Sequence, residues 1–219
     1  MSLTGSVSGK KGKIDDERKN AHWLNKDIID RCSLLGTTED CAQVTPEPFT
    51  KSIAEFSKAE IIIAKAVGLE REGDKVTAVK CVNKDGKEIN VPATDVVISA
   101  GPWSGDVAQK LLMPNEAKKC RVTGHRVHSI IARPAEGKEL TNHCLFTMIK
   151  EKSDTHEPEI YNRPGGEAYI CGAGDNVPLP EDASKVIPST NLINRLKSQG
   201  KLISPDYFND DMTVEREQA

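Results

Sequence analysis

The apolar positions in the first half of the chain follow helical spacing in some segments and form short continuous runs in others. The best predicted helix begins at Pro46, because Thr45 is a favourable N-cap and a proline loses no hydrogen bond at the first helical position. Phe49, Ile53 and Phe56 recur at i, i+4 and i+7, which predicts one buried stripe along this helix. The same spacing predicts two shorter helices, over residues 23–35 and 103–111.

Short strands are predicted after the Pro46 helix. Glu72-Gly73-Asp74 and Asn83-Lys84-Asp85-Gly86 read as hairpin turns, which makes residues 66–91 a three-stranded antiparallel meander. Its strands are expected over 66–71, 75–82 and 88–91. The runs 61–63 and 95–100 flank the meander, and their continuous apolar character is typical of strands buried on both faces.

The second half of the chain reads as rich in sheet. Strands are predicted over 122–133, 143–150, 158–162 and 167–171, followed by a helix over 189–198 and a further element from Val214. Arg163-Pro164-Gly165-Gly166 is a strong hairpin turn between the third and fourth of these strands. Gly172-Ala173-Gly174-Asp175 has no clear helix after it and places a carboxylate where a phosphate would bind, so it predicts a loop.

Composition and charge narrow the class of protein. The net charge of −3, with acidic and basic residues interspersed over 219 residues, argues against a nucleic-acid surface. No apolar run approaches the roughly 18 residues of a membrane span. Residues 1–20 carry no signal-peptide core and are expected to be disordered. The six irregularly spaced cysteines indicate reduced thiols and a cytoplasmic location, with peripheral association with an organelle left open.

Several motifs recur in a specific order along residues 24–219. They are Gln43-Val44-Thr45-Pro46, residues 64–69, residues 75–79, residues 95–104, Gly124-His125-Arg126-Val127-His128-Ser129, residues 158–161 and residues 169–172. In this order they resemble the middle of the FAD-dependent oxidoreductases of the D-amino-acid oxidase, sarcosine oxidase and glycine oxidase superfamily. The last three motifs are similar to its fungal branch.

The resemblance implies an α/β (mixed α+β) fold with a partial Rossmann-like FAD-binding domain, a β-meander and a sheet-rich substrate-binding domain. We expect a disordered segment over 1–20, a helical lead-in packing on the substrate side over 21–42, an incomplete FAD-binding domain over 43–118 and a substrate-binding domain over 119–219. The turn at Ala100, Gly101 and Trp103 would pass close to FAD, and Val67 would meet its adenine through the backbone. A tight strand–helix turn without a ligand is the alternative interpretation.

The chain also departs from this superfamily. The FAD site there begins with a strand and G-x-G-x-x-G, whose amides hold the pyrophosphate, and this chain has no such motif. The C-terminal segment that closes over the flavin is absent too. We therefore expect an internal fragment that binds FAD weakly or not at all. It should expose apolar surface around 61–63 and 96–98, which favours self-association.

The implied substrate is a small amine or amino acid. Arg126 is a candidate partner for its carboxylate, with an exposed strand arginine as the alternative. His125 and Tyr161 are further substrate-side candidates, with exposed or core residues as the alternatives. His125 and His128 cannot share a metal ion, because residues three apart on a strand point to opposite faces.

No catalytic residue is assigned. The sequence shows no cysteine–histidine spacing typical of a zinc site and no Ser/His/Asp arrangement, which argues against a metalloenzyme or a hydrolase. The alternative function is a non-catalytic binding or regulatory protein that keeps the fold and has lost FAD.

Overall fold

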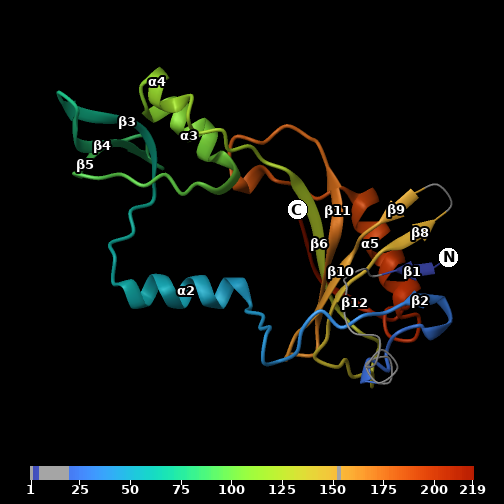
Figure 1. The fold of residues 1–219 in the computed structure, drawn as a ribbon. Helices are drawn as coiled ribbons and strands as arrows, with labels where there is room; N and C mark the ends of the chain where they lie inside the picture. Colours follow the sequence, from blue (N-terminus) through green and yellow to red (C-terminus); the bar gives the residue numbers. More distant parts are fainter. Residues whose placement is uncertain (1, 5–19, 152–153) are drawn as a thin grey trace. The chain divides into compact units, whose positions relative to one another are not determined.

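The computed structural model describes residues 2–4, 20–151 and 154–219 and divides into two compact units (Figure 1). Unit 1 combines residues 1–41 with 126–219, and unit 2 comprises residues 42–125. The disorder expected over 1–20 falls almost entirely on residues outside the described part of the chain. None of the described helices is long and apolar enough to cross a membrane.

A five-stranded antiparallel sheet forms the centre of the described part of unit 1. Its strands lie in the order β12 (Thr213–Gln218), β6 (Arg126–Arg133), β11 (Ala168–Asp175), β10 (Glu159–Asn162) and β7 (Cys144–Phe146). The predicted hairpin between β10 and β11 is confirmed. Its turn is closed by bonds from the amide of Arg163 to the carbonyl of Glu167 (2.8 Å) and from the amide of Gly166 to the carbonyl of Arg163 (3.0 Å).

Helix α5 (Thr190–Ile203) covers one face of this sheet (Figure 1). It extends five residues beyond the predicted end at Ser198, and Gly200 and Ile203 in this extension are both buried. Ile130, Ile160 and Ile170 project from three neighbouring strands toward the helix and are fully buried. Burial of each such side chain contributes about 2 kcal/mol to the stability of unit 1. The opposite face of the sheet is less covered, and most of its side chains are half-buried or exposed.

The helix predicted over 23–35 is wrong. A 3₁₀ turn at Lys26–Ile28 is followed by strand β2 (Ile29–Arg31), and the structure describes every residue of this segment. Tertiary contacts replace helical ones here. The amide of Asn25 donates to the carbonyl of Ile203 (2.8 Å), and Trp23 is buried edge-to-face against Phe208. The helical lead-in over 21–42 is therefore corrected to irregular chain that contains one 3₁₀ turn and one short strand.

A second sheet of unit 1 contains β2, β1 (Ser2–Thr4), β8 (Ile149–Glu151) and β9 (Asp154–His156) in that order. The single strand predicted over 143–150 is wrong, because β7 and β8 belong to different sheets. The chain leaves the first sheet at Thr147, whose amide and hydroxyl both donate to the carbonyl of Pro158, at 3.2 and 2.5 Å. The strand predicted from Val122 begins only at Arg126.

Unit 2 contains the predicted meander, formed by β3 (Ala64–Glu72), β4 (Lys75–Asn83) and β5 (Glu88–Pro92). Helix α3 (Ser104–Leu111) follows a 3₁₀ turn at Gly101–Trp103. The short α4 (Pro114–Ala117) is held to β3 by an ion pair of 2.9 Å between Arg71 Nη2 and Glu116 Oε2.

Helix α2 (Pro46–Ser57) confirms the predicted helix, but the predicted burial of its apolar stripe is wrong. Phe49, Ile53 and Phe56 are 50%, 52% and 88% exposed. Amphipathic spacing was sufficient to form the helix, whereas burial also needs a surface against which the stripe can pack. No residue of α2 is buried by the described chain.

The strands predicted over 61–63 and 95–100 are also wrong, since neither segment pairs with another strand in the described chain. Ile61, Ile63 and Val97 are 68%, 80% and 85% exposed. A strand buried on both faces requires neighbouring strands and covering layers, which the described residues do not supply at these positions. The apolar exposure predicted around 61–63 and 96–98 is present.

Candidate functional site

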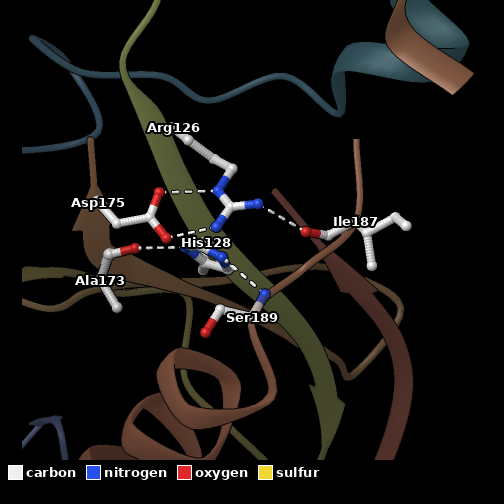
Figure 2. Close-up of polar contacts among 6 residues, drawn as sticks. All are labelled: Arg126, His128, Ala173, Asp175, Ile187 and Ser189. Atoms are coloured by element: carbon white, nitrogen blue, oxygen red, sulfur yellow. Dashed lines mark hydrogen bonds and ion pairs between the residues drawn. The ribbon is translucent and has the colours of Figure 1, made fainter. Parts of the chain in front are cut away.

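A polar cluster lies where strands β6 and β11 adjoin the segment that leads into α5 (Figure 2). Arg126 Nε donates to Asp175 Oδ1 at 2.8 Å, and Arg126 Nη2 donates to Asp175 Oδ2 at 2.5 Å. The remaining nitrogen, Nη1, donates to the carbonyl oxygen of Ile187 at 2.8 Å. The guanidinium therefore binds both oxygens of the Asp175 carboxylate and also holds the chain just before α5.

The pair remains partly accessible, with side-chain exposures of 21% for Arg126 and 25% for Asp175. The hydrogen bonds from Arg126 lower the pKa of Asp175, and the same bonds raise the pKa of Arg126. A carboxylate ligand would have to displace Asp175 to reach this guanidinium. The predicted role of Arg126 in substrate binding thus depends on an exchange of partners.

His128 lies in the same cluster and is fully buried. Its Nδ1 is 2.9 Å from the carbonyl oxygen of Ala173, and its Nε2 is 2.9 Å from the amide nitrogen of Ser189 (Figure 2). A carbonyl only accepts and an amide only donates, so the network assigns the neutral tautomer with its proton on Nδ1. Both ring nitrogens are used by the backbone, and His128 acts as a clip between the sheet and the start of α5.

A bulge in β11 aligns this cluster. Cys171 pairs with Ser129 and Ala173 pairs with His128, which leaves Gly172 as an extra residue. Its φ of +128° suits glycine, and a Cβ at this position would lie 2.7 Å from the carbonyl oxygen of Glu157. The loop predicted over 172–175 is therefore wrong, because β11 continues through the bulge to Asp175.

A second group of side chains lies on the less covered face of the sheet, along the β10–β11 hairpin. Tyr161 is opposite Tyr169 in the hairpin register, and its hydroxyl donates to Glu159 Oε2 at 2.5 Å. The Cys171 Sγ is 3.9 Å from the same oxygen. Burial, together with the bond to Glu159, raises the pKa of Tyr161. Burial raises the pKa of Cys171 to about 11.

The remaining substrate-side candidate is His125. It is exposed and belongs to unit 2, immediately before β6. Among the described residues, no group of three or more His, Cys, Asp or Glu side chains is arranged to hold a metal ion.

The four residues expected near FAD all lie in unit 2. Val67 is the extra residue of a bulge in β3, between Ala66 and Gly68, and is 45% exposed. Gly101 has a φ of +54° and begins the turn before α3. No atom lies within 4 Å of a Cβ built on Gly101, so its backbone, rather than crowding by the chain, requires glycine.

These residues do not by themselves fit the pyrophosphate of FAD. The amide of Ala100 already donates to Ser104 Oγ (3.0 Å), and the amide of Trp103 donates to the carbonyl of Ala100 (3.1 Å). None of the four carries a positive charge, whereas a diphosphate is held by free amides or cations. They are apolar and suit contact with a flat ring system only.

The known proteins that this chain resembles include two fungal relatives. The chain is 28% identical over 218 residues to "Putative oxidoreductase TDA3" of Saccharomyces cerevisiae, which covers 84% of this chain and 39% of the relative. It is 28% identical over 180 residues to "Putative oxidoreductase C1F5.03c" of Schizosaccharomyces pombe, covering 74% and 44%. The chain thus spans about two fifths of the length of these relatives.

Among solved structures, the chain resembles a glycerol-3-phosphate dehydrogenase from Bacillus halodurans complexed with FAD. The TM-score is 0.47 at 17% identity, over 71% of this chain and 29% of that one. The family model described as "FAD dependent oxidoreductase" (DAO) matches residues 12–218, nearly the whole sequence. The chain therefore belongs to the DAO family of FAD-dependent oxidoreductases.

Proposed function

We propose that this chain supplies part of an FAD-dependent oxidoreductase that oxidises a small amine or amino acid. In such enzymes the flavin supplies the redox chemistry, while the protein binds and orients the substrate. The observation that carries the proposal is the five-stranded sheet of unit 1 in a chain that matches the family over residues 12–218. Tyr161 and Glu159 on its less covered face supply aromatic and polar groups of the kind that line small-molecule sites.

The proposal divides the work between the two units. Unit 1 would provide the substrate side, through Tyr161 on the less covered face of the sheet or through Arg126 on the α5 face, which could meet a substrate carboxylate once Asp175 is displaced. Unit 2 would provide contacts to the flat parts of the cofactor through Gly101 and Val67. Tight binding of the diphosphate would need amides or cations beyond these residues, so this chain alone should bind FAD weakly or not at all.

A non-catalytic binding or regulatory protein is the second candidate function. The amides at Ala100 and Trp103 already have partners within the chain, and the sequence has no G-x-G-x-x-G. Both observations favour, for this chain taken by itself, a fold that does not use the flavin. In this case the sheet face of unit 1 would retain a ligand-binding role.

The test is a titration of the purified 219-residue chain with FAD, followed by flavin absorbance and fluorescence, with the purified S. pombe relative measured in parallel. We expect saturable binding by the relative and little by this chain. Each protein that binds FAD is then given a panel of amines and amino acids, and reduction of the flavin is recorded without oxygen. If a relative binds FAD and none of these compounds reduces its flavin, the proposed substrate class is contradicted. Tight stoichiometric binding by this chain would contradict the incomplete cofactor site.

A further inference from the structure

Three aromatic rings and one carboxylate meet on the face of the five-stranded sheet opposite α5. Phe146, Tyr161 and Tyr169 come from three neighbouring strands, β7, β10 and β11. The register places Phe146 opposite Glu159 and Tyr161 opposite Tyr169, so all four side chains project to the same side. We call these four residues the aromatic corner.

The rings of the aromatic corner lie at steep angles to one another. The centroids of Phe146 and Tyr161 are 5.8 Å apart with an interplanar angle of 84°, and those of Tyr161 and Tyr169 are 6.0 Å apart with an angle of 51°. Phe146 is 51% exposed, so the corner is open to a ligand on one side. Rings that meet at steep angles can present more than one π face or edge to a single bound group.

Glu159 gives the corner a negative charge. One carboxylate oxygen, Oε2, accepts the Tyr161 hydroxyl, and the described residues form no ion pair with this carboxylate. The basic residue of the adjoining turn, Arg163, lies over the Tyr169 ring with its guanidinium carbon 5.3 Å from the ring centre, so the rings of Tyr161 and Phe146 are the ones left for a ligand. A half-buried carboxylate beside aromatic rings attracts a cation and repels an anion.

We propose that the aromatic corner binds the ammonium group of an organic cation, with Glu159 as its counter-charge and the rings of Tyr161 and Phe146 as its cation–π partners. A carboxylate group of a ligand is excluded from this position by the charge of Glu159. The ammonium site does not depend on the proposed function. Only the statement that its ligand is the substrate rests on that function. In that case the substrate is an amine that presents its cationic end here, and Arg126 belongs to a separate part of the surface.

The experiment follows the tyrosine rings of the full 219-residue chain by NMR, after selective isotope labelling of tyrosine. The sequence has three tyrosines, and Tyr207 serves as the reference because its ring packs against His22 and Lys138, away from the corner. The probe is tetramethylammonium chloride, and tert-butanol and sodium chloride are the controls for shape and ionic strength. We expect saturable shifts of Tyr161 and Tyr169 with the cation only, and no shift of Tyr207.

Two variants test the assignment. Glu159→Gln keeps the size of the side chain and should weaken binding of the cation about three- to tenfold, whereas the matched change Glu139→Gln at an exposed loop position should leave binding unchanged. Phe146→Leu removes one ring without touching the carboxylate and should also weaken binding. Equal shifts with tert-butanol, unchanged binding by both corner variants, or no saturable shift in the unmodified chain would each overturn the inference.

The outcome is separate from that of the FAD titration. If the chain fails to bind FAD but still shows the tetramethylammonium shifts, the result agrees with both the ammonium site and the second candidate function. If amines reduce the flavin of the longer relative but the aromatic corner of this chain does not bind the cation, only the ammonium site is overturned.

Discussion

Replacing Gly200 with alanine is predicted to destabilise unit 1, although the same change stabilises most helices. Gly200 lies in α5 and is buried against β11. A Cβ added there would be 3.2 Å from the Cδ1 of Ile170 and 3.7 Å from the Cβ of Phe208. Ile170 is fully buried in the centre of the core, so its terminal methyl group cannot move away without disturbing its other neighbours.

The expected magnitude follows from two opposing effects. Alanine improves helix propensity by about 1 kcal/mol, whereas overpacking a closed core costs about 1–3 kcal/mol. Gly200→Ala should therefore lower the free energy of unfolding by about 1 kcal/mol. Ile170→Val removes the crowded methyl group at a cost of about 0.5–1.5 kcal/mol by itself. In the Ile170→Val background, Gly200→Ala should become neutral or stabilising, which gives a coupling free energy of about 1–2 kcal/mol.

The assay is urea unfolding of the four proteins of this double-mutant cycle. Each unit contains one tryptophan, so Trp103→Phe leaves Trp23 as a fluorescence reporter of unit 1 alone. Trp23 is buried in the same core, with its ring 6.4 Å from that of Phe208. Asn194→Ala, at an exposed position of α5, is the matched control. It should have the same effect in both backgrounds, because it changes propensity without adding atoms to the core.

The reasoning would be refuted if Gly200→Ala changed the free energy of unfolding equally with isoleucine and with valine at position 170. A stabilising effect in the unmodified core would also refute it, since the contact at 3.2 Å would then be relieved without cost.

Four further predictions follow from the site and from the exposed segments. His128→Leu leaves two backbone groups without partners, so it should destabilise unit 1 by about 2–4 kcal/mol and speed amide exchange at Ser189 most of all. Asp175 has a lowered pKa, so its contribution to stability is complete above the ordinary value of 3.8 and is lost as the pH falls through the folded value; Asp175→Asn should flatten acid unfolding there. Cys171 has a raised pKa, so its contribution is complete below pH 9.0 and is lost as the pH rises to about 11. Mass spectrometry should accordingly find its alkylation by iodoacetamide at least about a hundredfold slower than that of an ordinary thiol. Val97→Lys should reduce self-association in sedimentation experiments, because this side chain is 85% exposed.

Local chemistry predicted the turns, and the strands beside them, better than any other part of the chain. Arg163-Pro164-Gly165-Gly166 carries its conformation in its own residues, and β10 and β11 pair on either side of it. The same holds for Asn83-Lys84-Asp85-Gly86, where Asn83 Oδ1 accepts the amides of Asp85 and Lys87 at 2.9 Å. A turn of this kind needs no distant partner, so a short stretch of sequence is enough to identify it.

Burial and pairing depend on residues far along the chain and were predicted less well. The run 61–63 has the composition of a buried strand and lies exposed, because no described strand pairs with it. Residues 23–35 have helical spacing, yet Trp23 is fixed by contacts with Phe208 and Thr141, more than a hundred residues away. Spacing shows which side chains can share a face, but it does not show what covers that face.

The same limit applies to the candidate site. Arg126 and Tyr161 were selected from the sequence, whereas their partners Asp175 and Glu159 were not. Glu159 offered a usable signal, since residues two apart on a predicted strand share a face. Asp175 offered none, because it lies opposite Arg126 only when residue 172 is left out of the pairing, which the spacing of the sequence does not show.

At Gly172 a deletion should be tolerated better than a substitution, which is the reverse of the usual order within a strand. Any side chain at this position would collide with the carbonyl of Glu157 at 2.7 Å and with the Cα of Pro158 at 2.9 Å, and neither backbone atom can yield cheaply. Removing the residue altogether would straighten β11 and leave Ala173 and Asp175 opposite the same partners, on the same face as before. A homologue shortened by one residue here would therefore keep the Arg126 pair, whereas one of equal length with any other amino acid at this position would lose it.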